Sequence, residues 1–206
     1  MAISYPLSLP TSIGIANITL TANNAVAISE SPFTYQQQIV AHPGQRWSAT
    51  VSVPPLRREY VEPWVAMLLS LKGQVGTFLL GDPNGATPRG VATGTPLVKG
   101  ADQTGGTLEI DGAATSVTGW LLAGDYIQLG AGSTATLHKV LVDADSDVSG
   151  NVTLEIWPNI RTAPDDNAAV TLTNTVGRFR LATNQQSWSI NESSAYGLSF
   201  DCVEAL

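Results

Sequence analysis

Charged side chains are scarce in this sequence of 206 residues. Asp, Glu, Lys and Arg make up 13% of the chain, about half of the ~25% that is typical of soluble domains. Seventeen acidic residues against ten basic ones give a formal net charge of −7. This balance disfavours a protein that binds nucleic acid through clustered Lys and Arg. A weakly charged surface instead suits a protein that packs against neighbours, because an unpaired charge buried in an interface is costly.

Cysteine and long apolar runs are equally rare. The sole thiol, Cys202, cannot close a disulfide within the chain. The first residues lack the charged and apolar regions of a secretion signal. No apolar run approaches the ~18 residues that are needed to span a bilayer. We therefore expect a protein that is made and folded in a cytoplasm and that does not insert into a membrane.

The groups that usually carry catalysis are few and scattered. The two histidines lie in a Pro-Gly turn (His42) and inside an apolar strand (His138), and neither accompanies a nucleophile motif such as Gly-x-Ser-x-Gly. Glu59 and Glu62 stand one helical turn apart, as a glycosidase pair could, but they are more typical of the polar face of a helix. We expect no enzyme and no cofactor.

Two glycine-rich loops imitate nucleotide-binding motifs without their context. The loop "GDPNGATPRG" at 81–90 has neither the Gly-Lys-Ser/Thr end nor the helix of a phosphate loop. The loop "LGAGSTA" at 129–135 joins two predicted strands, whereas a dinucleotide fingerprint opens a helix. Ordinary turns are the better interpretation of both loops.

The segment "DADSDVSG" spaces Asp143, Asp145 and Asp147 as a calcium-binding EF-hand loop does. These three carboxylates are the weak metal candidates of the chain. However, Val148 occupies the place of the required glycine and Leu154 that of the bidentate glutamate. The sequence therefore favours a solvated acidic turn between strands.

Five tryptophans raise the question of a sugar-binding surface. Two of them, Trp120 and Trp157, are candidates for stacking on a glycan. All five stand in apolar or alternating stretches, where aromatic side chains contribute large buried areas to a β core. Core packing is therefore the competing interpretation, and the two remain open.

Alternation of apolar and polar residues recurs along the chain and predicts β-strands. It is clearest in "TYQQQIVAH", "RWSATVSVP", "YIQLG", "ATLHKVLVDA", "NVTLEIWP", "RFRLA", "SWSI" and "YGLSFDCVEA". Turn-forming residues separate these stretches in "ANNA", "HPGQ", "GDPNG", "TGG", "DSDVSGN" and "PDDN". The protein is predicted to be mainly β.

One segment has the period of a helix instead. In "LRREYVEPWVAMLLSLKGQ" the apolar positions fall at i, i+3, i+4, i+7 and i+8, and they are Val61, Trp64, Val65, Leu68 and Leu69. Gly73 is a suitable C-terminal cap. Pro63 either starts the helix late or lies within it.

The linkers indicate that one domain is inserted into another. About two dozen residues that are rich in Gly, Pro and Thr follow the strand "GTFLL", and this is longer than an ordinary connection inside a domain. A second punctuated stretch, "PNIRTAPDDNAA", lies downstream. We expect one domain from residues 1–81 and 177–206, with a smaller β module at 82–176.

The sequence also resembles a known family. The stretch "EPWVAMLLSLKGQVGTFLLGDPNGATPRG" is followed by "AGDYIQLG", "HKV", "LEIWPNIR" and "GRFRLATN". This succession, from Leu56 to Asn184, is similar to tail proteins of long-tailed bacteriophages (siphophages), specifically the distal tail protein type. The shared residues are structural and carry no catalytic signature.

The resemblance implies both a fold and a role. The fold would be a tail-tube-like β-sandwich or half-barrel with one flanking α-helix, plus an inserted small β-barrel. Such proteins form a ring, typically a hexamer, that joins the tail tube to the hub or fibre proteins of the tail tip, with DNA passing through its lumen. The location would be the virion, with assembly in the host cytoplasm.

Two alternatives accompany this hypothesis. One is a major tail-tube subunit or another baseplate protein, and the other is a glycan-binding module of the tail tip. The net negative charge further suggests a lumen wall that repels DNA.

Overall fold

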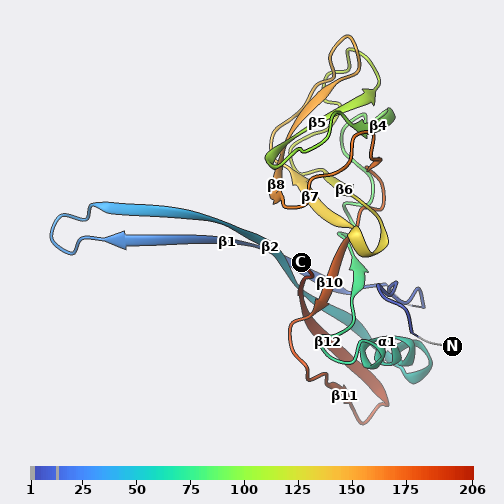
Figure 1. Cartoon of the computed structure of the whole chain (residues 1–206). Coiled ribbons are helices and arrows are strands. Elements are labelled where there is room, and N and C mark those ends of the chain that lie inside the picture. Colours follow the sequence, from blue (N-terminus) through green and yellow to red (C-terminus); the bar gives the residue numbers. More distant parts are fainter. Residues whose placement is uncertain (1–2, 13) are drawn as a thin grey trace.

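The computed structural model describes residues 3–12 and 14–206. It shows a mainly β protein with one α-helix and two six-stranded sheets. Figure 1 shows three parts: a body that contains the helix, a second sheet above it, and a long two-stranded arm that projects from the body. The predicted fold class, mainly β with a flanking helix and a small barrel-like module, is confirmed.

The body is built on sheet A, whose strands come from both ends of the chain. Their order is β1 (Asn17–Glu30), β2 (Gln37–Arg57), β12 (Ala195–Glu204), β10 (Gly177–Leu181) and β3 (Phe78–Leu80), and β11 (Trp188–Ile190) pairs with β12. All of these strand pairs are antiparallel. Alternate residues therefore face opposite sides of the sheet, and only one side is apolar.

Helix α1 (Arg58–Ser70) follows β2 directly and contacts β2 and β12. Its buried residues are Val61, Trp64, Val65, Met67 and Leu68. They join the apolar side of sheet A in one core, in which Phe78 packs against Phe179 and Phe200. The free energy that holds the body together comes chiefly from removing these aromatic and aliphatic groups from water.

The helix differs from its predicted form in one of the residues that it buries. Leu69, expected on the buried face, is 57% exposed, and Met67 is buried in its place. Pro63 lies inside the helix, which answers the question that the sequence left open. Lys72 and Gly73 both have positive φ just beyond the helix, at 52° and 69°.

Sheet B forms a separate, nearly closed barrel from the middle of the chain. Its order is β4 (Gly94–Val98), β5 (Gly105–Ala113), β8 (Val152–Ile160), β7 (Thr136–Val140), β6 (Tyr126–Leu129) and β9 (Val170–Thr171). A bridge between Leu97 and Ala169 brings the first strand back to the last. The barrel has its own apolar core, which includes Leu108, Ile110 and Trp120.

The chain leaves and re-enters the body at one narrow crossing. Gly81, just after β3, lies against Thr175, which precedes β10. A Cβ atom on Gly81 would come within 2.0 Å of the Thr175 carbonyl oxygen. The side-chain amide of Gln128 in the barrel also accepts a hydrogen bond from Val176 N–H, at 2.9 Å. Only glycine allows the outgoing and returning strands to pass this closely.

We expect Gly81→Ala to destabilise the protein by about 2 kcal/mol, because the backbone at the crossing must shift to relieve the overlap. Urea unfolding monitored by tryptophan fluorescence would measure the change. Gly14→Ala is the matched control, because an added Cβ at Gly14 meets nothing within 4 Å. Equal midpoints for both variants would show that the crossing is not tightly packed.

Candidate functional site

The three aspartates suggested as metal ligands serve separate turns. Asp143 accepts a hydrogen bond from Ala123 N–H and Asp145 accepts one from Gly119 N–H, both at 2.7 Å. Asp147 accepts from Ser149, and hydrogen bonding to Asn151 holds the pKa of this carboxyl below its usual value. No group of three possible metal-binding side chains occurs within residues 3–12 and 14–206.

The two tryptophans suggested for glycan stacking are both engaged in packing. Trp120 is fully buried in the barrel core, and its indole N–H donates to the Thr93 carbonyl at 2.8 Å. Trp157 is half-buried, and its ring meets that of Trp47 edge-on, with centroids 4.5 Å apart. Trp120 therefore has no free ring face on which a sugar could stack.

Among the described residues, neither histidine lies within a cluster of titratable side chains of catalytic geometry. His138 is buried, with Nδ1 2.7 Å from the Pro158 carbonyl and Nε2 3.0 Å from the Thr136 hydroxyl. His42 lies exposed on the arm. Glu62 forms an exposed ion pair with Arg58 along α1, at 2.9 Å, as its place on the polar face of the helix predicts.

The most distinctive surface of the molecule is the arm, which we define as residues 25–44. Here β1 and β2 continue beyond the body as a two-stranded ribbon whose outer end touches no other described part of the chain (Figure 1). Six residues per strand would carry it about 20 Å outward. An isolated hairpin of this kind is only marginally stable in water.

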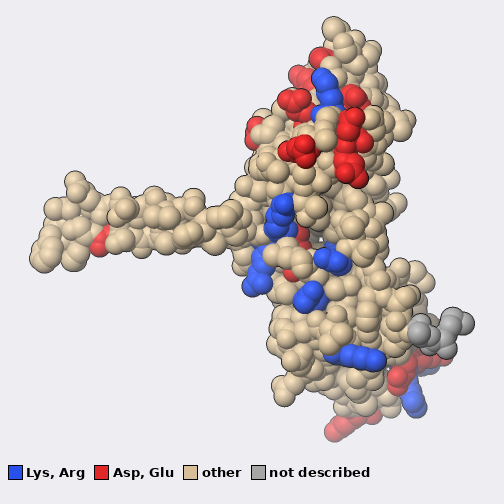
Figure 2. All heavy atoms as spheres, in the orientation of Figure 1, with Lys and Arg blue, Asp and Glu red and all other residues tan. Residues whose placement is uncertain are grey.

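The surface of the arm is apolar and almost free of charge. Val26, Ile28, Ile39 and Ala41 share one face of the ribbon, since Val26 pairs with Ala41 and Ile28 with Ile39. Ile28 and Ile39 are 63% and 61% exposed. At the tip, Phe33 and Tyr35 are 92% and 74% exposed. Glu30 is the only Asp, Glu, Lys or Arg of the arm, which is almost uniformly uncharged in Figure 2.

The arm begins where two predicted turns face each other. The segments "ANNA" and "HPGQ" were expected to end strands, but both lie inside continuous strands of the same ribbon. Asn24 pairs with Gln45 and Val26 with Ala41, so the register shifts between these two pairs. The turn-forming residues of "HPGQ" therefore make a bulge, which alters the local twist of a ribbon without interrupting it.

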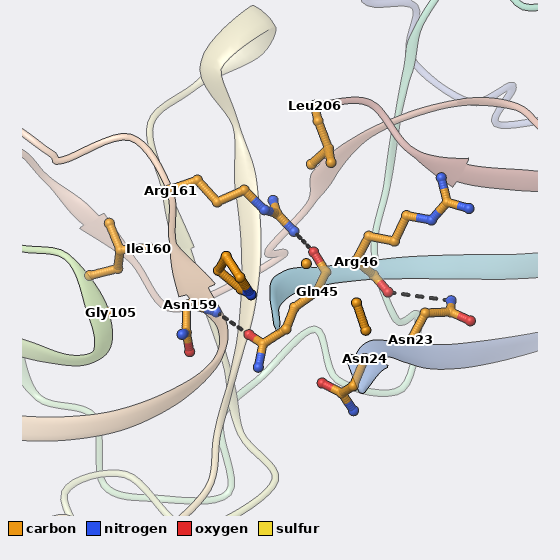
Figure 3. Close-up of a pocket in the computed structure, with 12 residues that line it drawn as sticks. Asn23, Asn24, Gln45, Arg46, Gly105, Asn159, Ile160, Arg161 and Leu206 are labelled. Atoms are coloured by element: carbon orange, nitrogen blue, oxygen red, sulfur yellow. Dashed lines mark hydrogen bonds between the residues drawn. The ribbon is translucent and has the colours of Figure 1, made fainter. Parts of the chain in front are cut away.

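The root of the arm, which we define as Asn24 on β1 and Gln45 on β2, is attached to the barrel by the side chains of both residues. The Trp157 indole N–H donates to the Asn24 side-chain oxygen at 2.8 Å. The Asn159 backbone N–H donates to the Gln45 side-chain oxygen at 2.7 Å. Asn24, Gln45 and Asn159 line a hollow of about 720 Å³. Figure 3 shows it between these residues, the end of β8 and Leu206.

A buried carboxylate completes the attachment. Glu204 of β12 accepts a hydrogen bond from the Trp47 backbone N–H at 3.0 Å and pairs with the Arg161 guanidinium at 3.1 Å. The side chain of Glu204 is 4% exposed. Arg161 also donates to the Gln45 carbonyl (Figure 3). One carboxylate thus connects the body, the arm root and the barrel.

Comparison with known proteins adds no family assignment. No family model and no curated protein matches the chain. In the part of the chain that the structure describes, no helix is long and apolar enough to cross a membrane. The arm and its root are therefore the candidate functional site on structural grounds alone.

The arm cannot be recognised as a functional element from local patterns in the sequence. Apolar alternation in "AVAIS" and "QQIVAH" looks the same whether the strand lies in a core or in solvent. A usable signal was the near absence of charge from residues 25–44, because exposed strand edges usually carry charged residues that prevent association.

We expect Arg161→Gln to destabilise the protein by about 3 kcal/mol, because it leaves the buried Glu204 carboxylate without its cation. Differential scanning calorimetry and urea unfolding would measure the loss. Arg58→Gln removes one arginine from an exposed pair on α1 and should change stability little. Similar small effects in both variants would contradict a structural role for the Glu204 pair.

The free energy of unfolding should also depend on pH, through the buried His138. Burial lowers the pKa of His138 from its usual 6.5, so the folded protein holds the neutral imidazole. As the pH falls below about 6.5, the unfolded chain binds a proton that the folded chain resists. The free energy of unfolding should therefore decrease, down to the lower pKa of the folded state. His138→Gln should flatten this part of the profile, and an unchanged slope would count against the assignment.

Proposed function

We propose that the protein is a structural subunit of a bacteriophage tail, of the distal tail protein type, which assembles into a ring through its arm. The single observation that carries the proposal is the arm, a long ribbon with exposed apolar side chains and no core of its own. The resemblance in sequence supplies the family, and the arrangement of body and barrel agrees with what that family implies.

The surface chemistry of the arm favours burial against protein. Aromatic residues are enriched at protein interfaces and charged residues are depleted from their cores. The arm has this composition at Phe33, Tyr35 and the Val26, Ile28 and Ile39 stripe. Monomeric soluble proteins rarely leave such a continuous apolar surface in water.

The partner that best fits the arm is another copy of the same chain. An arm that leaves one side of a body and docks on a different surface of the next copy makes a head-to-tail contact. Such contacts close into a ring when the rotation between copies is a whole fraction of a turn. Six copies, a central lumen for DNA, and attachment to the tail tube and to tail-tip hub or fibre proteins follow from the family resemblance.

The barrel then acts as a fixed outer module of the subunit. The Asn24–Trp157 and Gln45–Asn159 contacts tie it to the arm root. In this arrangement the surface of the barrel is available for hub or fibre proteins. The proposed function consists of binding other proteins through these surfaces, and no catalytic residue is assigned.

The proposal is tested by removing the arm. Deletion of residues 26–41 joins Ala25 to His42 and leaves a short loop between the paired Asn24 and Gln45. We expect the parent to form rings, alone or with the tail-tip hub of the same particle, and the deleted variant to remain a folded monomer. Light scattering and negative-stain imaging would distinguish the two states.

A point variant refines this experiment. Phe33→Ser combined with Ile28→Ser and Ile39→Ser keeps the length of the arm but removes its apolar surface, and we expect at least a tenfold loss of ring formation. Val148→Ser, at an 82% exposed position outside the arm, is the control. A parent that stays monomeric even with the hub, or a deleted variant that still assembles, would refute the proposal. Many copies along the tail would identify a major tail-tube subunit instead.

A further inference from the structure

The charges of the protein are segregated between its parts. Residues 82–176 contain eleven of the seventeen acidic residues and four of the ten basic ones, which leaves six of each in the remainder. The whole net charge of −7 therefore belongs to the inserted segment, and the body with its arm is neutral. In Figure 2 Asp and Glu gather over the barrel, whereas Lys and Arg gather at the waist below it.

Three arginines of the body lie together on the polar side of sheet A. Arg178 and Arg180 alternate with the buried Phe179 on β10, so both point away from the core. Arg180 pairs with Val203 of β12, and Val203 pairs with Ser48 of β2. Arg46, two residues before Ser48, therefore faces the same side as Arg180.

The spacing of these residues makes a compact basic patch. Arg46 on β2 and the two arginines of β10 are separated by one strand, β12, and neighbouring strands lie about 4.8 Å apart. The three guanidinium groups can therefore reach one ligand that extends across the sheet. We call Arg46, Arg178 and Arg180 the arginine patch.

None of the three arginines of the patch forms an ion pair within the described chain. Within residues 3–12 and 14–206 there are only two ion pairs, Arg58–Glu62 and Arg161–Glu204. Arg178 donates to the Ala205 carbonyl through Nε and Nη2. The Nε atom of Arg180 is buried and has no hydrogen-bond partner. Asp201 lies on the same side of β12, two residues before the Val203 that pairs with Arg180, and its carboxylate accepts a hydrogen bond from the Thr50 hydroxyl at 2.6 Å.

The rest of the polar side of sheet A consists mainly of hydroxyl and amide groups. Strand alternation and pairing place small polar residues of β1, β2 and β12 on it. They are Asn17, Thr19, Thr21, Asn23, Ser48, Thr50, Ser52 and Ser199. The same side also holds two half-buried apolar residues, Leu79 and Val203, which pair with Arg178 and Arg180. Hydroxyl and amide groups nevertheless outnumber the apolar groups, unlike the core of a typical protein interface.

We propose that this side of sheet A binds the phosphate backbone of double-stranded DNA through the arginine patch. Arg, Ser, Thr and Asn side chains are the usual donors to phosphate oxygens, and such contacts carry no sequence information. This inference rests on the proposed function, because it is the proposed ring, with DNA in its lumen, that would bring DNA to this surface. In the proposed ring the polar side of sheet A would attract DNA through three arginines per subunit, whereas the net negative charge of the protein lies on the barrel.

The test uses the full chain and a fluorescein-labelled 20-base-pair duplex of arbitrary sequence. Fluorescence anisotropy would be measured from 20 to 200 mM NaCl. We expect Arg46→Gln/Arg178→Gln/Arg180→Gln to weaken binding at least tenfold at the lowest salt. The slope of log affinity against log salt should decrease by up to about 3, because three phosphate contacts are lost. A second, unrelated duplex should bind the parent equally.

The matched control removes the same number of charges elsewhere. Arg57→Gln/Arg58→Gln/Lys72→Gln changes the end of β2 and the region of α1, remote from the arginine patch, and should bind within about twofold of the parent. The double variant Arg46→Gln/Arg180→Gln keeps the hydrogen bonds of Arg178 to Ala205. It therefore tests whether the triple variant loses DNA binding only because it unfolds. It should still lose most of the salt dependence that the triple variant loses.

Three outcomes would overturn the inference. The parent could fail to bind the duplex at 20 mM NaCl, or the control could lose as much affinity as the patch variant. The patch variant could also bind DNA normally but lose self-association, which would assign the patch to the acidic barrel of a neighbouring copy. The variant that lacks residues 26–41 separates the two proposals, because it should fail to form rings and still bind DNA.

Discussion

The arrangement of the body, the arm and the barrel depends on the hydrogen bond and the ion pair that the buried Glu204 carboxylate forms. This carboxylate lies at the end of β12, accepts a hydrogen bond from the Trp47 N–H of β2, two residues beyond Gln45 of the arm root, and pairs with the Arg161 guanidinium from the barrel. A buried charge is tolerated only when its partners are in place. The positions of the three parts are therefore coupled through this carboxylate, in addition to the direct contacts of Asn24 and Gln45 with the barrel.

Strand β2 transmits this constraint outward. It runs from Gln37 to Arg57 without a break, first along the arm and then through the middle of sheet A. Its inner half is fixed by pairing on both sides, with β1 and with β12. Because a paired strand resists bending, the direction of the arm follows from the packing of the body, modified only by the bulge at His42 to Gly44.

Local patterns predicted much of this fold. Helical spacing at Val61, Trp64, Val65 and Leu68 and strand alternation in the barrel reflect burial, which leaves a direct trace in the sequence. Turn-forming residues were less informative, because the Pro-Gly pair of "HPGQ" serves a bulge as well as a turn. Whether Val26, Ile28 and Ile39 lie in a core or in water depends on distant packing, which no local pattern encodes.

Composition was least informative where charges are concerned. A total of −7 suggested a protein that repels DNA, yet it averages an acidic barrel with a neutral body. The arginine patch arises only when β2 and β10, more than a hundred residues apart in sequence, are placed on either side of β12. Electrostatic attraction is local at physiological salt, where charges more than about 8 Å apart are largely screened.

The apolar arm and the polar side of sheet A together specify how a subunit would have to be oriented in the proposed ring. In the proposed ring a neighbouring copy would cover the apolar arm, and the hydroxyls and arginines on the polar side of sheet A would face the DNA. Because Glu204 and the Asn24–Trp157 contact fix the arm relative to sheet A and the barrel, docking the arm on a neighbour also fixes which surface faces inward. In the proposed ring, assembly and exposure of the arginine patch would thus depend on the same few contacts at the base of the arm.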